Sequence, residues 1–259
     1  MTSKGIVLPQ NQAEIVPAYH RLRQAMIDKL INGDWAPGSR LPSERQLARE
    51  TGLCVGTVRK AFETMTQHGY LVRIQGKGTF VAESTINARE VRYYSIRAHL
   101  ASPDVALSIR VLGRDEAPLS AAPADLRLSS DTITGFLRIR RLFVGKRDNT
   151  ACPVVVTTSY FPLPLCADLR RVSVQELERV SLYLLAEKYC GVAAARSEEL
   201  LRAEGACGHV ARLLEIPEGT PIICAQMQSF SARGHLLELR ESHIRTNPFG
   251  LVRSHTGTA

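Results

Sequence analysis

Long apolar runs are missing from this sequence. No stretch of about 18 uncharged apolar residues, the length that a transmembrane helix needs, occurs in the chain. The segment Met1–Pro9 holds one lysine and only a three-residue apolar stretch, which is too short for a signal peptide. We therefore expect no membrane association and a cytoplasmic location.

Cysteine pairs with the spacing of a metal site are also missing. No Cys-x-x-Cys pair occurs, and the cysteines have no metal-ligand spacing. This pattern argues against a zinc site and favours reduced thiols that pack like small apolar groups. The sequence predicts neither a bound metal nor a cofactor. The six cysteines are Cys54, Cys152, Cys166, Cys190, Cys207 and Cys224.

Recognisable catalytic motifs are absent too. The Gly-x-Ser-x-Gly, His-Glu-x-x-His and phosphate-loop patterns do not occur. His235 and His243 are eight residues apart in an expected hairpin, and Glu198 and Glu199 would point to opposite faces of a strand. We expect no catalytic residues and no enzyme.

What the sequence does contain is an ordinary globular composition with an uneven positive charge. It is 44% apolar and 22% charged, has a net charge of +8, and is long enough for two modest domains. Residues 1–82 hold eleven Lys and Arg against six Asp and Glu, whereas residues 83–259 hold twenty-two against nineteen. The concentrated charge favours an anionic partner for the first third of the chain.

The first third has the pattern of three helices. Apolar residues recur at three- and four-residue spacing over residues 18–31, which predicts one helix. Ser43 followed by Gln46 predicts a capping box at the start of a second helix, and Gly52 suits its left-handed end. A third helix follows and ends at Gly69. Its predicted inner face consists of Val58, Ala61, Phe62 and Met65.

The third helix is followed by a predicted hairpin. Residues 70–74 and 79–81 have strand character, and Gln75-Gly76-Lys77-Gly78 forms a tight turn between them. Two helices joined by a short corner can place the start of the second one in the major groove of DNA. A glycine-rich, cationic hairpin tip lets the backbone approach a phosphate or the minor groove. The helix start would present Gly56, Thr57, Arg59 and Lys60.

Four motifs in this order resemble the winged helix-turn-helix domain of the GntR family of transcriptional regulators. The resemblance implies that Arg45, Thr57 and Arg59 contact operator DNA and that Gly76 enters the minor groove. Ser43 and Lys77 are then expected to contact backbone phosphates. The motifs are Leu41-Pro42-Ser43-Glu44-Arg45, Thr57-Val58-Arg59-Lys60-Ala61, Gly69-Tyr70-Leu71 and Gly76-Lys77-Gly78-Thr79-Phe80-Val81.

One position departs from that family. The family often has Ser-Arg where this chain has Cys54-Val55, so an arginine that usually helps to recognise a base is missing. We expect an operator that differs from the common one. Val55 could instead contact the methyl group of a thymine.

The remaining two-thirds of the chain predict an α+β domain. Short turns between neighbouring strands indicate a largely antiparallel sheet, with helices packed on one side. The predicted strands cover residues 107–112, 134–144, 153–160, 221–230 and 236–244, and the predicted helices cover residues 181–190 and 207–215.

Four further motifs occur in this region: Gly135-Phe136-Leu137-Arg138-Ile139-Arg140-Arg141-Leu142, Thr158-Ser159-Tyr160-Phe161-Pro162, Ser181-Leu182-Tyr183 and Leu213-Leu214-Glu215-Ile216-Pro217-Glu218-Gly219-Thr220-Pro221. With them, the region resembles the UTRA effector domain of the HutC subfamily of GntR regulators, whose fold is shared with chorismate lyase. The resemblance covers most of residues 107–245.

Arg138 and Arg140 alternate along one predicted strand, so their guanidinium groups point to one face. They could converge on a phosphate, phosphonate or carboxylate, or they could be paired arginines on a solvated face. The resemblance implies effector binding by Arg138, Arg140, Ser159 and Glu238. Ile244 stands where some relatives that bind sugar phosphates have a tyrosine, which weighs against a phosphosugar.

The sequence therefore predicts a winged helix-turn-helix domain over residues 1–82, a linker over 83–95 and an effector and dimerisation domain over 96–259. We expect a homodimeric repressor on a two-fold symmetric double-stranded DNA operator. Its effector would be a small anion such as a sugar phosphate, phosphonate or carboxylate. Two alternatives stay open: an enzyme with a chorismate-lyase-like domain, and a constitutive DNA-binding dimer without a ligand.

Overall fold

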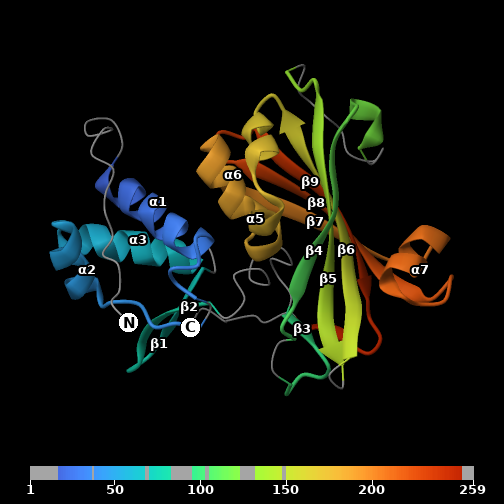
Figure 1. Cartoon of the computed structure of the whole chain (residues 1–259), viewed down its shortest axis with the longest axis horizontal. Coiled ribbons are helices and arrows are strands. Elements are labelled where there is room, and N and C mark those ends of the chain that lie inside the picture. Colours follow the sequence, from blue (N-terminus) through green and yellow to red (C-terminus); the bar gives the residue numbers. More distant parts are fainter. Residues whose placement is uncertain are drawn as a thin grey trace. The chain divides into compact units, whose positions relative to one another are not determined.

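The computed structural model describes residues 17–36, 38–67, 70–82, 95–102, 105–122, 132–147 and 150–252. The chain divides into two compact units, residues 1–92 and 93–259, and each is described by itself (Figure 1). The expected linker lies almost wholly outside the described residues, as does Gly69, so the domain boundaries stay a prediction. No helix within the described residues is long and apolar enough to span a membrane.

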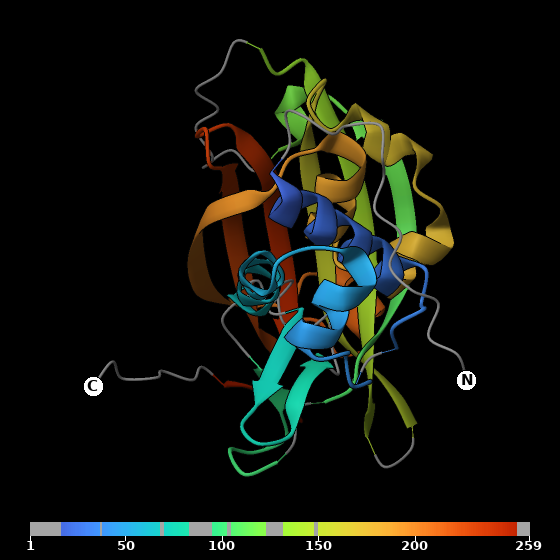
Figure 2. The ribbon, with the colours of Figure 1, turned by 90° about the vertical axis from the view of Figure 1, so that its left-hand side faces the viewer.

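The described residues of the first unit form three helices and an antiparallel hairpin, as the sequence predicts. Figure 2 shows the hairpin, in cyan, extending away from the helices. The elements are α1 (Ala18–Ile31), α2 (Glu44–Thr51), α3 (Val55–Gln67), β1 (Leu71–Ile74) and β2 (Gly78–Val81). Burial of apolar side chains between the helices stabilises this unit. Its fully buried side chains include Leu22, Met26, Leu47, Val58, Ala61, Phe62 and Met65, so the predicted inner face of α3 is confirmed.

The ends of α2 follow from single residues. The Ser43 side chain accepts a hydrogen bond from the backbone N–H of Gln46 at 3.2 Å, and Gly52 ends the helix with φ at 70°. The other half of the predicted capping box is wrong. The Gln46 side chain donates to Glu50 Oε1 at 2.9 Å, because a partner four residues ahead lies on the same exposed helix face.

The second unit is built on a six-stranded, fully antiparallel sheet in the order β4-β5-β6-β9-β8-β7. The strands are β4 (Ser108–Ala117), β5 (Gly135–Arg147), β6 (Thr150–Leu163), β7 (Ala194–Gly205), β8 (Pro221–Ser231) and β9 (Leu236–Arg245). A separate two-stranded sheet pairs β3 (Ser95–Arg97) with β10 (Gly250–Val252). The mostly antiparallel α+β fold is confirmed.

Helices cover both faces of the large sheet, which corrects the prediction that they pack on one side (Figure 1). α5 (Val174–Arg179) and α6 (Leu182–Cys190) lie on one face, and α7 (Gly208–Leu214) lies on the other. Leu142 and Val156 pack against α7, whereas the neighbouring Arg141 donates to the Leu177 carbonyl of α5. Adjacent residues of a strand point to opposite faces, so both faces of β5 are covered. We call these the α6 face and the α7 face.

Several elements of this unit were not predicted from the sequence, among them β7 and α5. β7 is an edge strand that is exposed along nearly its whole length, so it lacks the apolar alternation that predicts a strand. α5 has only six residues, but Ser173 and Glu176 form a complete capping box at its start, a signal that the sequence does contain. The described residues of this unit also form two short 3-10 helices, η1 (Leu119–Ala121) and η2 (Ala167–Arg171).

Candidate functional sites

Glu44 joins three elements of the N-terminal unit through two exposed arginines. Arg59 on α3 donates from Nε to Glu44 Oε2 at 3.0 Å, and Arg73 on β1 donates to the other oxygen of the same carboxylate. Both arginine side chains are more than half exposed, whereas that of Glu44 is 17% exposed. Glu44 is the first residue of α2. Its carboxylate therefore holds the guanidinium groups of Arg59, from α3, and Arg73, from the hairpin, beside the start of α2.

A groove beside these arginines collects several of the predicted DNA contacts. It has a volume of about 1290 Å³ and is lined in part by Ser43, Arg45 and Arg59. Val55, the position that departs from the family pattern, lines the same groove, and so does the hairpin residue Thr79. Residues from α2, α3 and the hairpin, far apart along the chain, thus line a single concave surface.

Thr57 lies at the start of α3 and contacts Cys54. The Cys54 Sγ atom is 3.0 Å from Thr57 Oγ1, and the Thr57 N–H donates to the Cys54 carbonyl at 3.0 Å. Hydrogen bonds from Thr57 lower the pKa of the exposed Cys54 thiol. A DNA contact by the Thr57 hydroxyl would share or replace its contact with Cys54.

The tip of the β1–β2 hairpin has an open backbone. Gly76 adopts φ of 73°, and an added β-carbon there would meet no atom within 4 Å. Gly78 also has a positive φ, but its added β-carbon would lie 3.2 Å from Arg40 Nε. Lys77 between them is exposed. The tip can therefore approach a ligand closely at Gly76, while Gly78 packs against the body of the unit.

Arg138 and Arg140 lie on the α7 face of β5. Arg138 forms two hydrogen bonds with the Asp115 carboxylate of β4, and Arg140 Nη2 lies 3.7 Å from Asp115 Oδ1. The hydrogen bonds with Asp115 raise the pKa of Arg138. Gly113 leaves room for Arg140, because an added β-carbon would come within 2.7 Å of Arg140 Nη2. Both arginine side chains are partly exposed and share one carboxylate.

A group of buried polar side chains lies on the opposite, α6 face of the sheet. Arg240 donates to both oxygens of Glu238, at 2.9 and 2.8 Å, and the Tyr183 hydroxyl lies 2.7 Å from Ser229 Oγ. Register places Ser159 opposite Arg240 and Thr157 opposite Arg141. We call this group the polar cluster. It comprises Arg141, Thr157, Ser159, Tyr183, Ser229, Glu238 and Arg240, each at most 2% exposed.

The electrostatics of the polar cluster favour an added anion. Burial and the charge of Arg240 lower the pKa of Arg141, and Glu238 acts in the opposite direction. Burial also raises the pKa of Tyr183, so this phenol stays neutral. Among the described residues, the hydroxyls of Thr157 and Ser159 are buried without a hydrogen-bond partner. The cluster thus combines positive charge with free polar groups.

The four predicted effector residues do not share one pocket. Register pairs Arg138 with Tyr160 and Ile139 with Ser159, so Arg138 and Ser159 point to opposite faces. Ser159 and Glu238 belong to the polar cluster, but Arg138 and Arg140 lie across the sheet from it. Arg141 was not among the predicted effector residues. Strand alternation places it on the face opposite Arg138, but the sequence does not say which of the two faces is enclosed.

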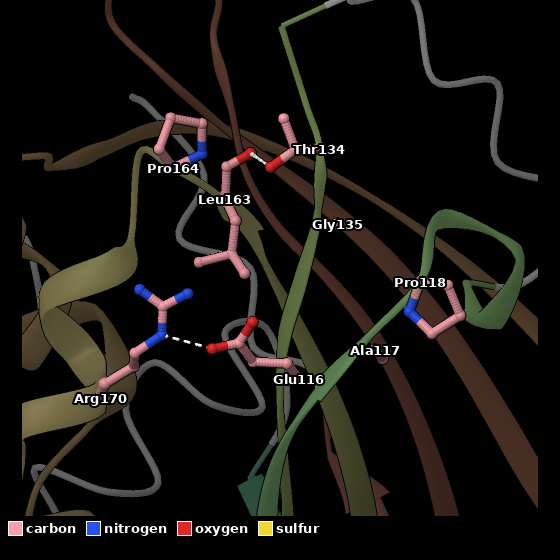
Figure 3. Close-up of a pocket in the computed structure, with 8 residues that line it drawn as sticks. All are labelled: Glu116, Ala117, Pro118, Thr134, Gly135, Leu163, Pro164 and Arg170. Carbon is pink, nitrogen blue, oxygen red and sulfur yellow. Dashed lines mark hydrogen bonds and ion pairs between the residues drawn. The ribbon is translucent and has the colours of Figure 1, made fainter.

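A smaller surface pocket of about 340 Å³ lies where β4 and β6 end and β5 begins (Figure 3). Figure 3 shows Arg170 and Glu116 pointing toward each other across it, and Arg170 Nε donates to Glu116 Oε1 at 2.7 Å. The Thr134 hydroxyl donates to the Leu163 carbonyl at 3.4 Å. The pocket lining includes none of the predicted effector residues.

A helix-turn-helix with a cationic wing, followed by a ligand-binding α+β domain, defines a class of DNA-binding regulators. The family model "Bacterial regulatory proteins, gntR family" matches residues 18–81, and the UTRA domain model matches residues 104–249. The chain therefore belongs to the GntR family and carries a UTRA effector domain. Members of this family regulate transcription, so the chain is a transcriptional regulator and not an enzyme.

Similar proteins cover nearly the full length of the chain. A helix-turn-helix transcriptional regulator from Mycobacterium tuberculosis is 29% identical over 89% of this chain and 82% of its own length. The histidine utilization repressor of Pseudomonas putida is 28% identical over 88% of each chain. The solved ligand-binding domain of a GntR-family regulator from Bordetella bronchiseptica has the same fold, with a TM-score of 0.51 and 22% identity over 64% of this chain and 98% of that one.

Proposed function

We propose that this regulator is a repressor that binds a two-fold symmetric operator as a homodimer and is released by a small anion in its UTRA domain. The names of two relatives support repression: the histidine utilization repressor of Pseudomonas putida and the repressor NagR of Bacillus subtilis, the latter 23% identical over 93% of this chain. Two-fold symmetry follows from the way in which helix-turn-helix dimers occupy paired half-sites.

On the DNA side, Arg45, Thr57 and Arg59 contact bases in the major groove, and Gly76 enters the minor groove. Arg45 and Arg59 line the groove at the start of α2 and α3, and Glu44 holds Arg59 in place. Arginine can form two hydrogen bonds with guanine. Ser43 and Lys77 contact phosphates, because both are exposed and carry donor groups.

On the effector side, the observation that carries the proposal is the pair of buried, unpartnered hydroxyls of Thr157 and Ser159 beside Arg141 and Arg240. A buried polar group without a partner costs about 1–3 kcal/mol. An anionic ligand with a phosphate, phosphonate or carboxylate group would accept hydrogen bonds from these hydroxyls and from the guanidinium groups. Tyr183 brings α6 into the site, so a bound ligand would contact that helix directly.

Arg138 and Arg140 form a second candidate for the anion site, favoured by their exposure and their convergence on Asp115. Asp115 already neutralises part of their charge, and neither arginine is enclosed. The polar cluster offers more donors in a drier environment, where a charged ligand is recognised more strongly. We therefore place the effector on the α6 face.

The experiment that tests this function is a titration of fluorescently labelled promoter fragments with the full-length protein, followed by anionic metabolites. We expect specific binding, occupancy by two subunits, and release by one class of anion. A ligand can release DNA only if it binds the two states with different affinity. Specific binding that no anion weakens would favour the constitutive DNA-binding dimer.

A further inference from the structure

Three neighbouring strands bring a carboxylate, a thiol and an imidazole together on the α7 face of the sheet. Glu204 comes from β7, Cys224 from β8 and His243 from β9, and one ligand atom from each lies within 4.8 Å of the other two. Register places Cys224 directly opposite His243. Glu241, two residues before His243 on β9, adds a second carboxylate on the same face.

One distance within this group is typical of a tetrahedral metal site, and the other ligand atoms lie within 4.8 Å of one another. His243 Nε2 lies 3.3 Å from Glu204 Oε1 and 3.7 Å from Glu241 Oε1. Zinc bonds of about 2.0–2.3 Å at tetrahedral angles place neighbouring ligand atoms roughly 3.3–3.8 Å apart. Glu204 and His243 already have this spacing, and Cys224 lies close enough to complete the group after a shift of its side chain.

The ligand types select the kind of ion. One thiolate sulfur, one imidazole nitrogen and carboxylate oxygens are ligands of Zn²⁺, whereas Mg²⁺ and Ca²⁺ prefer oxygen alone. Without a cation, the arrangement is electrostatically unfavourable for a thiolate. Burial, together with the carboxylates of Glu204 and Glu241, raises the pKa of Cys224 to about 12. Arg202 offsets part of this effect, and it also donates to Gln226 at 2.8 Å.

We propose that Glu204, Cys224 and His243 bind one Zn²⁺ ion and leave its fourth position open to water. Binding displaces the Cys224 thiol proton to solvent, because the thiolate is the form that ligates. The ion links the exposed edge strand β7 to β8 and β9. Since the site lies on the α7 face and the polar cluster on the α6 face, it is separate from the proposed effector site.

The test is a titration of the metal-free, full-length protein with Zn²⁺ in competition with a chromophoric chelator, and with Co²⁺ as a spectroscopic probe. We expect one ion per chain, a thiolate-to-cobalt charge-transfer band and a higher unfolding temperature with metal. Cys224→Ser should remove the band, and Cys224→Ser or His243→Asn should weaken Zn²⁺ binding by more than the ~10- to 100-fold typical of an outer-shell change. Cys207→Ser and His209→Asn, which alter exposed residues on and beside α7, are the matched controls.

A second measurement covers the case in which a ligand variant fails to fold. In the wild-type chain in a low concentration of urea, where buried thiols become accessible through transient opening, Zn²⁺ should slow alkylation of Cys224, read by mass spectrometry, while leaving the exposed Cys207 unaffected. The proposal is overturned if Zn²⁺ fails to protect Cys224. It is also overturned if folded Cys224→Ser keeps the cobalt band.

Discussion

Glu238 and Arg240 share two hydrogen bonds in the interior of the sheet's α6 face, at 2.9 and 2.8 Å, with side chains that are at most 1% exposed. The two residues are two positions apart on β9, so their side chains emerge on the same face. Pairing lets both charges remain buried, and it leaves Arg141 as a second cation in the same cluster.

Removing one member of this pair should strongly destabilise the fold. We expect Glu238→Gln to lower the free energy of unfolding by about 3–5 kcal/mol, because the Arg240 charge stays buried without its carboxylate. Urea unfolding measures the effect. Glu198→Gln is the matched control, since Glu198 pairs with Arg196 at the same two-residue spacing but in solvent, and should cost at most about 1 kcal/mol. Equal losses in both variants would contradict the assigned role of burial.

Arg59 is expected to contact a base. Replacing it with alanine should weaken specific operator binding by about 1–3 kcal/mol while leaving the unfolding free energy nearly unchanged. Fluorescence anisotropy on promoter fragments measures the loss. Arg212→Ala on α7 removes the same charge from an exposed site in the other unit and should bind DNA like the wild type. Unaltered binding by Arg59→Ala would exclude Arg59 from the recognition surface.

Lys77 at the hairpin tip is expected to contact a phosphate and not a base. Lys77→Ala should weaken binding to specific and unrelated DNA alike, and should reduce the slope of log K against log salt by about one. The slope is obtained by repeating the anisotropy titration over a range of salt concentrations. A loss confined to the specific operator would show that Lys77 takes part in base recognition.

Val55 lines the groove next to Arg45 and is expected to contact a thymine methyl group. Operators in which single thymines are replaced by uracil test this, because only the methyl group is lost. We expect weaker binding at one position in each half-site, and Val55→Ala should abolish that difference. Affinity that is unchanged at every thymine would remove this contact.

Substitutions of Arg141 and Arg138 test which of the two candidate sites binds the anion, because each residue belongs to only one of them. If the effector binds in the polar cluster, Arg141→Met should abolish its ability to release the operator, whereas Arg138→Met should leave release intact. Both variants remove one charge from β5, but from opposite faces of the sheet. The measurement is operator release as a function of anion concentration, with DNA affinity as the check on folding. The reverse result would move the effector to the α7 face.

The N-terminal unit could be predicted closely because its signals are local. Apolar spacing over residues 18–31 defines α1, while Ser43 and Gly52 mark the ends of α2 through their own hydrogen bonding and backbone conformation. The exception was Gln46, whose side chain had two partners within reach and bonded to Glu50. The sequence spacing places both the Ser43 backbone N–H and Glu50 within reach of the Gln46 side chain, but it does not predict which of them Gln46 bonds.

In the second unit, the sequence by itself determined most strands and the α+β class, through alternating apolar residues and short turns. Only the tertiary structure decided which face of β5 each arginine occupies, because helices cover both faces and either parity can point inward. Arg141 lies in the polar cluster because strand register places it on the face that α6 covers, whereas Arg138 lies on the opposite face. Likewise, Glu204, Cys224 and His243 have no metal-ligand spacing along the chain, yet three paired strands place them within 4.8 Å. Strand alternation is a local property of the chain, whereas register and helix packing depend on residues far apart in sequence.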